Sequence, residues 1–494
     1  MTLATACWVG QLLCTLPLDG RPVRLGLPVP AAVVTRGLRA SGGATLQWRR
    51  LPIGGAAPDP VWVELAVVGH GRVAITAGGA GPHDSGSGPA CVREALREES
   101  PHGPITVTRW RWCNGVVDER RRLQCTVPLS LDGEAFAVAE AVTTDGFDAV
   151  ARAAVWCRLP RSLQSATGVL PPAGRLGEPL RRELLAALPA LRELPGRRGA
   201  GDYARSGGIV TNLEFDTTLA MLRCALASRD EAVLARALRS ARHLLDHDLD
   251  PRSGLPFAHG PDHRSGSPEP GHCWLQGLLW LGCLAADDDL LAAARSLGGA
   301  LAARPPTGSG RDERARDFAW PLLELEALLA LEPTPELAAA ADRLALAIAA
   351  RHDPVAQTFR FGEGELGRGL YLERAWVTGG IVLPALRAHL RRRPDRRLAE
   401  LVRGVEAALV RAITAAPQGV PLLWRTAGGE SFGVVQACAD ARAVMLLAGL
   451  APAELARFAR RDGIAERLAG TIVPDDPDLA TTWTMVARCE WVWR

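Results

Sequence analysis

The feature that most constrains this fold is a degenerate repeat of helical segments in the second part of the chain. Five segments begin with polar and aromatic residues and continue as an apolar run, at 212–222, 271–281, 315–325, 371–383 and 430–446. One aromatic residue from each aligns them at intervals of 59, 46, 56 and 56 residues: Phe215, Trp274, Trp320, Trp376 and Phe432. Segments with 3.6-residue periodicity, such as 230–250 and 334–353, alternate with them. A repeat of about 50 residues predicts stacked helical hairpins. Five or six hairpins closed into a ring form an (α/α)6-type toroid.

Before residue 166 the pattern is typical of β-structure. Short segments rich in Val, Thr and Trp are separated by Gly, Pro and Asp, at 61–69, 71–79, 105–113, 121–131 and 149–159. The N-terminal 20 residues lack a basic leader, so we interpret them as a first strand and not as an export signal. We therefore predict a multidomain protein, all-β plus all-α. Its parts are a β-rich barrel or sandwich region (1–165), a linker with a first helix (166–200) and an almost purely helical toroid domain (201–494).

Composition excludes several classes of function. The 494 residues include no lysine, so Schiff-base chemistry and a P-loop lysine are excluded. The net charge of +3 does not draw the chain to nucleic acid or to a membrane surface. No apolar run reaches the roughly 18 residues that a membrane-spanning helix needs. The 11 cysteines are scattered without a CxxC pair. This usage is typical of reduced thiols and predicts a cytoplasmic protein.

Histidines are concentrated in one part of the helical region. Five of the ten lie within one stretch, His243, His247, His259, His263 and His272. His243 and His247 are one turn apart near a helix C-terminus, where capping is the ordinary explanation. The other three lie on or just after a long loop, 248–270, and loops of this length are usually functional. His272 stands at a predicted helix start, where free N–H groups favour an anionic ligand.

Two further segments carry polar residues into the same kind of helix. The Gly-rich stretch "GDYARSGGIVTNLEFDTT" (201–218) offers Tyr203, Arg205, Asn212, Glu214 and Asp216. The stretch "YLERAWVTGG" (371–380) offers Tyr371, Arg374 and Trp376. The inner helices of a toroid run parallel, so their starts share one end of the ring. We therefore expect these side chains to line one mouth. Trp274, Trp320 and Trp376 could stack on sugar rings there, although packing in a core is the commoner role of tryptophan.

Residues 201–290 resemble the toroid of the exo-rhamnogalacturonan lyase-like (YetA-like) family. The resemblance rests on "GDYARSGGIVTNLEFDTTLAML", "ARHLLDHDLD" and "GHCWLQGLLWLGCLAADD", and "GRPVRLGLPVPAAVV" (20–34) looks like that family's first β-domain. Gln276 stands where the family pattern has Glu, and the family's fuller β-sandwich is shorter in this chain. The resemblance implies a carbohydrate-active lyase that cleaves a uronate-containing oligosaccharide, of the rhamnogalacturonan type, by β-elimination.

Such a reaction removes the C5 proton of the uronate and expels the group at C4. It needs a base, an acid and a group that neutralises the carboxylate. We expect His272 or His259 to be the base and Tyr203 the acid, with the neutraliser drawn from Arg205, Asn212 and Arg374. The other candidate substrate-binding residues are Glu214, Asp216, His263, Trp274, Tyr371 and Trp376. No cofactor is expected, although a divalent metal ion could serve as neutraliser.

Three alternatives stay open. A glycoside hydrolase would use Glu214 or Asp216, but residues two apart on a helix diverge by about 200°. Its second carboxylate would come from elsewhere: Glu269, Glu373 or Glu430. A non-catalytic glycan-binding or assembly protein could use the same toroid. A metal site could use Asp246, Asp248, His259 and His263, although no metalloprotease motif is present.

Overall fold

The computed structural model describes residues 12–19, 23–29, 31–35, 37–50, 61–78, 92–100, 103–112, 115–118, 122–123, 128–131, 134–137, 142–143, 178–195, 199–228, 230–250, 252–285, 287–303, 315–360, 371–415, 419–427, 430–437, 440–451, 453–454 and 470–489. The chain divides into two compact units. The first comprises 1–170, 224–242 and 279–291, and the second 171–223, 243–278 and 292–494. The boundary predicted at residue 165 and the strand predicted at 149–159 lie outside the described residues.

The described strands of the first unit pair in antiparallel fashion. They are β1 (Leu12–Asp19), β2 (Val23–Val29), β3 (Leu38–Ala40), β4 (Thr45–Arg50), β5 (Val61–Val68), β6 (His70–Ala77), β7 (Val92–Ser100), β8 (Gly103–Trp112), β9 (Gly115–Asp118), β10 (Arg122–Leu123), β11 (Pro128–Leu131), β12 (Glu134–Ala137) and β13 (Val142–Thr143). A short helix, α1 (Ala31–Val34), follows β2. The sheet orders are β1-β6-β3, β2-β5-β4, β13-β10-β9-β8-β7 and β11-β12.

Two of these sheets share one buried apolar cluster. It includes Leu18 from β1, Trp48 from β4, Val63 from β5 and Ile75 from β6. The strands expected at 61–69, 71–79 and 105–113 are confirmed as β5, β6 and β8. The single strand expected at 121–131 is wrong, because β10 and β11 belong to different sheets. Pro128 opens β11, and proline is placed best at the first residue of a strand. The barrel or sandwich stays a prediction.

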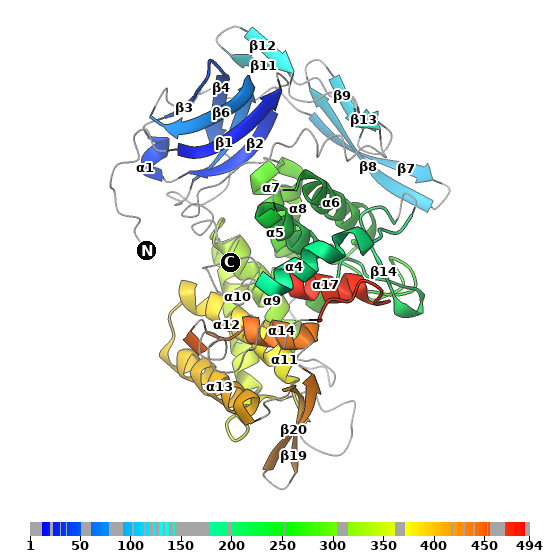
Figure 1. Cartoon of the computed structure of the whole chain (residues 1–494), viewed down its shortest axis with the longest axis vertical. Helices are drawn as coiled ribbons and strands as arrows, with labels where there is room; N and C mark the ends of the chain where they lie inside the picture. Colours follow the sequence, from blue (N-terminus) through cyan, green and yellow to red (C-terminus); the bar gives the residue numbers. More distant parts are fainter. Residues whose placement is uncertain are drawn as a thin grey trace. The chain divides into compact units, whose positions relative to one another are not determined.

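The remainder of the chain is mostly helical, with small antiparallel sheets (Figure 1). The helices are α4 (Glu178–Ala187), α5 (Thr217–Ser228), α6 (Glu231–His243), α7 (Gln276–Ala285), α8 (Asp288–Ala303), α9 (Ala315–Leu329), α10 (Pro335–Ala350), α11 (Ala375–Val377), α12 (Leu383–Arg392), α13 (Arg396–Ala415), α14 (Ala441–Ala448) and α17 (Leu479–Arg488). The strands are β14 (Ala204–Arg205), β15 (Ile209–Val210), β16 (His352–Asp353), β17 (Thr358–Phe359), β18 (Tyr371–Leu372), β19 (Gly419–Ala427) and β20 (Glu430–Ala437). Shorter turns are 3₁₀ (Leu188–Ala190, Ser206–Gly208, Pro270–His272) or π-helical (Leu244–Asp248, Thr378–Val382).

Six of these helices contact one another in a closed circuit, and the contacts that follow join residues of the second unit. Asp216, just before α5, accepts a hydrogen bond from Gly277 of α7, and Glu324 of α9 accepts one from Gln276 of α7. α9 packs against α12, the turn before α12 packs against α14, and α14 packs against α17. Thr484 of α17 closes the circuit at 3.4 Å from Thr217 of α5. Second helices pack against three of the six: α4 on α17, α10 on α9 and α13 on α12. This circuit is consistent with the predicted toroid.

The repeat explains why the circuit closes. Four of the five aligned aromatic residues meet in one buried cluster. The ring centroid of Phe215 lies 6.3 Å from Trp274, 6.3 Å from Trp320 and 6.4 Å from Trp376. Each of these hairpins therefore contributes one ring to a common centre, and aromatic pairs at such distances add to the stability gained by burial. The aromatic residues recur at similar intervals in the sequence because each helical hairpin places one ring in this shared cluster.

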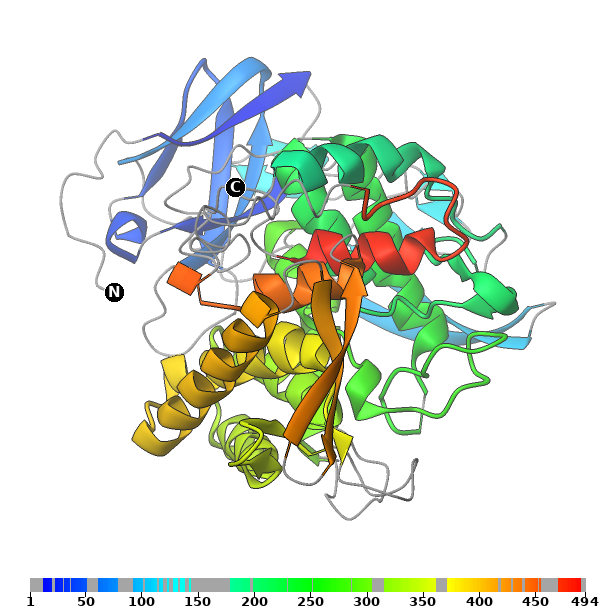
Figure 2. The same ribbon diagram turned by 60° about the horizontal axis from the view of Figure 1, so that its bottom comes forward.

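The fifth repeat was predicted incorrectly. Phe432 lies in strand β20, which pairs with β19 in a long antiparallel hairpin (Figure 2). The stretch 430–437 is rich in Phe and Val, which favour strands when a partner strand is present. The helix begins later, at α14, where the Asp440 side chain accepts a hydrogen bond from the N–H of Arg442. The region after residue 200 is therefore not almost purely helical, although every described strand pairing in it is antiparallel.

Close approach of α14 to the preceding turn gives a stability prediction. A Cβ added at Gly449 would overlap the carbonyl oxygen of Gly379. We expect Gly449→Ala to lower the free energy of unfolding by about 1–3 kcal/mol, because the two backbones must separate. Gly299→Ala in α8 is the matched control, since its Cβ would meet no atom within 4 Å. That change should leave the melting temperature unchanged or raise it. Equal melting temperatures for the two variants would contradict this contact.

Candidate functional site

A strained backbone turn, 212–216, connects the Gly-rich loop to α5. Four of its residues have positive φ: Asn212 (45°), Leu213 (54°), Phe215 (64°) and Asp216 (61°). Such a conformation costs on the order of 1–3 kcal/mol for each non-glycine residue. It persists only where the surrounding structure imposes it, and it is concentrated at functional sites. This turn is therefore the local reason to look for a site beside it.

Hydrogen bonds hold the turn from both ends. The Asn212 N–H donates to Asp202 at 3.1 Å, and its side-chain amide donates to three backbone carbonyls at 3.0–3.2 Å, those of Phe257, Ala258 and His263. Asp216 accepts from the N–H of Leu219 at 2.9 Å and from Gly277 at 3.0 Å. Asn212 thereby fastens the histidine-rich loop to the turn. Because its amide nitrogen is used in this way, we assign Asn212 a supporting role and not that of carboxylate neutraliser.

The first cluster beside the turn, called the Glu214 group, consists of Glu214, His259 and His272 with Arg205 and Glu269. The imidazoles of His259 and His272 meet edge-to-face with centroids 5.4 Å apart. Nδ1 of His259 lies 3.7 Å from Oε2 of Glu214, and Nδ1 of His272 lies 2.9 Å from Oε2 of Glu269. Arg205 forms an ion pair with Glu214 at 2.6 Å. Each histidine therefore has a carboxylate on its Nδ1 side.

This group is partly open to solvent. The side chain of His259 is 32% exposed and that of Glu269 is 46% exposed, whereas Glu214 and His272 are buried. Burial lowers the pKa of His259 below its ordinary value, with Glu214 opposing the shift and His272 adding to it. The contact with His272 lowers the pKa of Glu269. Near neutral pH the group therefore offers a neutral imidazole of His259 and an ionised Glu269.

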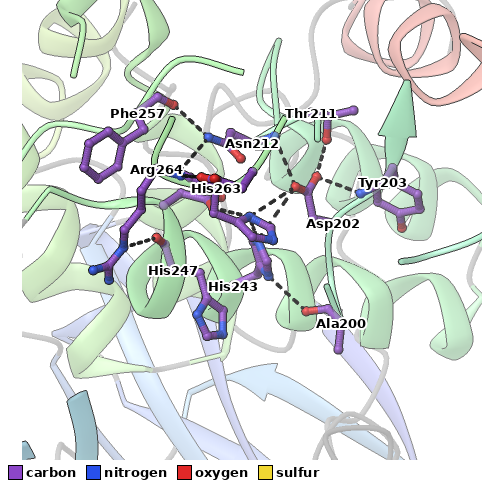
Figure 3. A network of polar contacts seen from close by, with 12 residues as sticks. Ala200, Asp202, Tyr203, Thr211, Asn212, His243, His247, Phe257, His263 and Arg264 are labelled. Atoms are coloured by element: carbon purple, nitrogen blue, oxygen red, sulfur yellow. Dashed lines mark hydrogen bonds and ion pairs between the residues drawn. The ribbon is translucent and has the colours of Figure 1, made fainter. Parts of the chain in front are cut away.

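The second cluster, called the Asp202 group, consists of Asp202, His243, Asp248 and His263. Figure 3 shows His243 and His263 converging on Asp202, which is also held by Tyr203 and Thr211. Nε2 of His243 lies 3.2 Å from Asp248 Oδ1 and 3.2 Å from His263 Nδ1. The capping explanation of His243 is wrong, because its side chain contacts these groups and the carbonyl of Ala200 instead.

Burial and charge oppose each other in the Asp202 group. Burial raises the pKa of Asp202, and His243 only partly offsets this. Burial alone would lower the pKa of His243, but the carboxylate of Asp248 outweighs it and raises that pKa to about 9. Among the described residues, two separate sets of ligand atoms are each close enough together to hold one metal ion. One set is the Asp202 group, and the other is Glu214, His259 and His272. The metal set expected from the sequence is not assembled, because Asp248 and His263 lie in one group and His259 in the other.

A third, buried arrangement joins three helices and was missed by the sequence analysis. Arg488 of α17 lies 3.3 Å from Glu324 and 3.5 Å from Asp216. Glu324 also accepts hydrogen bonds from the N–H groups of Leu275 and Gln276, at the start of α7. Burial raises the pKa of Glu324 to about 7, although Arg488 opposes the shift. Asp216 is therefore a structural residue here. It and Glu214 contact different groups, but the helix expected at both positions begins only at Thr217.

His272 differs from its prediction in one respect. It lies in the 3₁₀ turn Pro270–His272 and not at the first turn of α7, which begins at Gln276. The N–H groups at that helix start are occupied by Glu324 and Asp216. The expected anion site at the helix start is therefore wrong, because protein carboxylates already fill it.

The other predicted residues have the following places. Tyr203 is 1% exposed beside Asp202, and Trp274 and Trp376 are buried in the aromatic cluster. Glu373 is buried and accepts hydrogen bonds from Ala315 and Arg374. Tyr371 lies in β18, where its backbone is opposite that of Arg425 in β19. Burial leaves the two tryptophans no surface on which to stack a sugar, and Glu373 no place as a second hydrolase carboxylate.

No protein-family model matches the sequence, and no curated protein matches it. The resemblance to the exo-rhamnogalacturonan lyase-like family therefore stays a prediction.

Three solved structures are similar in fold. A cellobiose 2-epimerase from Bacillus thermoamylovorans is 12% identical, with 59% of this chain and 85% of that chain covered and a TM-score of 0.44. A polysaccharide lyase is 12% identical, with 57% and 89% covered and a TM-score of 0.41. A family 76 glycoside hydrolase from a bovine Bacteroides thetaiotaomicron strain is 9% identical, with 97% and 98% covered and a TM-score of 0.43. Likenesses at this level assign neither a family nor an activity to this chain.

In the part of the chain that the structure describes, none of the helices combines the length and the apolar character needed to cross a bilayer.

Proposed function

We propose that this chain is a carbohydrate-active enzyme, built on an (α/α)6-type toroid, that cleaves a uronate-containing oligosaccharide by β-elimination at the Glu214 group. The observation that carries the proposal is the pair of imidazoles 5.4 Å apart, each with a carboxylate on its Nδ1 side. The strained turn beside them supports a functional role for the same place. The reaction type rests on the family resemblance.

His272 is the proposed base. If its Nδ1–H faces Glu269, the lone pair of Nε2 is left to accept a proton, as in other carboxylate–histidine dyads. Nε2 takes the C5 proton of the uronate, and the C5–H electron pair becomes the C4=C5 double bond as the C4–O bond breaks. The protonated imidazole then returns its proton to the departing oxygen. One histidine can therefore serve as base and acid, and buried Tyr203 has no part in this scheme.

Arg205 is the proposed neutraliser of the uronate carboxylate. Its guanidinium holds Glu214 through Nη1 and has further N–H groups in the same plane. A bidentate contact with the substrate carboxylate would oppose the charge that builds up at C5. His259 completes the site as a neutral imidazole beside His272, so that His272 can become protonated without a second positive charge against it.

The first test is an absorbance assay with the full chain and a panel of uronate-containing oligosaccharides. A lyase produces the ultraviolet chromophore of a 4,5-unsaturated uronate, and we expect that signal. A hydrolase using Glu214 with Glu269 would release reducing ends without the chromophore. A binding or assembly protein would give neither product. Either of the last two outcomes, with binding of the same oligosaccharide demonstrated, would contradict the proposal.

The proposal also predicts the direction of the pH dependence. Both imidazoles must be neutral in the free enzyme, so kcat/KM should fall as the pH drops. Because burial lowers the pKa of His259 below 6.5, its contribution to that fall should appear below pH 6.5. His259→Gln should remove that contribution. If kcat/KM instead rises as the pH falls, a protonated histidine is acting as neutraliser and the base role is wrong.

A further inference from the structure

We propose that Asp202, His243, Asp248 and His263 bind a zinc ion in a closed, structural site. The proposal concerns the Asp202 group and does not depend on the reaction proposed for the Glu214 group. Two histidine nitrogens and two carboxylate oxygens are a donor set that Zn²⁺ accepts. Ca²⁺ and Mg²⁺ prefer sites made only of oxygen. The metal site predicted from the sequence shares only Asp248 and His263 with this set, and helix capping was the role expected for His243.

The distances between the four donor atoms match a tetrahedral ion. Zinc bonds of about 2.0–2.2 Å place tetrahedral ligands about 3.3–3.6 Å apart. In the structure, His243 Nε2 lies 3.2 Å from Asp248 Oδ1, 3.2 Å from His263 Nδ1 and 3.7 Å from Asp202 Oδ2. His263 Nδ1 lies 3.0 Å from Asp248 Oδ1 and 3.7 Å from Asp202 Oδ2. These five separations bracket the tetrahedral value on both sides.

The surrounding hydrogen bonds orient the donors toward a common centre. Nδ1 of His243 lies 3.2 Å from the carbonyl oxygen of Ala200, so this nitrogen carries a hydrogen, and loss of the Nε2 proton on metal binding would free that lone pair for the ion. A backbone carbonyl on the second ring nitrogen is the usual support of a metal-bound histidine. Asp202 is fixed in the same way, by the N–H groups of Tyr203 and Asn212 and the hydroxyl of Thr211 (Figure 3).

A buried, unsatisfied atom points to a missing cation. Oδ2 of Asp248 is buried and has no hydrogen-bond partner among the described residues. Asp202 and Asp248 are both fully buried, and a protonated His243 compensates only one of the two carboxylates, so burying both is costly without a further positive charge. A divalent ion at the centre of the four donors supplies that charge.

Burial indicates that the ion is structural. His263 has the most exposed side chain of the four, at 12%, so the described residues around the donors leave no open position for a substrate. The four donors come from the Gly-rich loop, the end of α6 with the turn that follows it, and the histidine-rich loop. A zinc ion would therefore fasten these three segments together. Along the chain, the strained turn 212–216 follows Asp202 and His259 precedes His263, so the ion would anchor both parts of the Glu214 group.

The test is the metal content of the full chain, purified without chelator or affinity metal and measured by mass spectrometry of the elements. We expect about one zinc ion per wild-type chain, bound to the deprotonated ligand set. His263→Gln, at the most exposed donor, and Asp248→Asn should each lose most of that zinc. Two controls should keep it: His247→Gln, next to the site with its ring 5.0 Å from His243, and His272→Asn in the Glu214 group.

Several outcomes would overturn the proposal. They are a folded wild type without zinc, equal loss of zinc in His247→Gln, and loss in His272→Asn with retention in His263→Gln. Because the two donor variants could fail to fold, wild-type protein stripped of metal provides the second measurement. Adding Co²⁺ alone should give the intense visible bands of four-coordinate cobalt, and Zn²⁺ alone should restore the melting temperature lost on stripping. Stripped protein with an unchanged melting temperature and no cobalt bands would contradict a structural ion.

Discussion

His272→Asn should lower turnover of a cleaved uronate oligosaccharide by about 10²–10⁴-fold, the usual contribution of a positioned base. The change removes Nε2 of His272. Because Nδ1 faces Glu269, Nε2 is the ring nitrogen of this dyad that can accept the C5 proton. Its effect should appear in kcat and kcat/KM equally, because the proton is transferred only in the transition state. The measurement is steady-state kinetics of chromophore formation, with the melting temperature recorded for each variant.

Two other variants make this result specific. Glu269→Gln keeps a polar side chain of the same size beside His272 but removes the charge, and it should lower kcat less than His272→Asn. His352→Asn replaces a half-buried histidine in β16, outside both groups, and should leave kcat unchanged. A His272→Asn enzyme with wild-type kinetics would remove the base from the scheme. A loss of activity that follows the melting temperature across the variants would make His272 a structural residue.

Arg488→Met should destabilise the fold by about 3–5 kcal/mol, because it leaves buried carboxylates without their counter-ion. The guanidinium lies between Glu324 and Asp216 and also 4.6 Å above the ring of Trp320, at the centre of the helix circuit. Denaturant unfolding measures the change. Arg396→Met is the matched control, because Arg396 is exposed and pairs with Glu400 on its own helix. The control should show no measurable change.

The pKa of Glu324 sets the pH dependence of this destabilisation. That pKa is about 7 in the folded chain, above the ordinary value of 4.5, so folding favours the protonated form. The stability contributed by this group is complete below pH 4.5 and is lost as the pH rises through about 7. Arg488→Met should consequently be more harmful at pH 8 than at pH 5, and adding Glu324→Gln should recover part of the loss. A pH-independent effect of Arg488→Met would contradict a buried, titrating Glu324.

The helix circuit could be predicted because each repeat carries an aromatic residue at a corresponding position. One buried aromatic ring in each repeat, at or near the first turns of its helix, produces an interval that can be measured in the sequence, and four such rings meet in the structure. The fifth interval was misleading because Phe432 favours a strand as readily as a helix. Only pairing with the preceding strand, β19, decides between them. Periodicity within one segment cannot supply that information.

The candidate site was predictable in part for a similar reason. His259, His263 and His272 were identified because histidines are rare and these lie close in sequence. Their division into two groups depends on Asn212. Its side-chain amide donates to the carbonyl of Ala258, just before His259, and to the carbonyl of His263. Asp202 was missed because a lone aspartate in a Gly-rich loop carries no signal by itself. Glu324 and Arg488 were missed because 164 residues separate the partners of their ion pair.

Proton NMR of a uronate oligosaccharide cleaved by the full chain distinguishes β-elimination from hydrolysis, because it shows which bonds of the sugar have changed. We expect a vinylic H4 signal together with loss of the C5 proton in the product of the wild-type enzyme, and we expect His272→Asn to form that product about 10²–10⁴-fold more slowly. A product that retains the C5 proton, with new reducing-end signals and no vinylic proton, would contradict β-elimination at the Glu214 group.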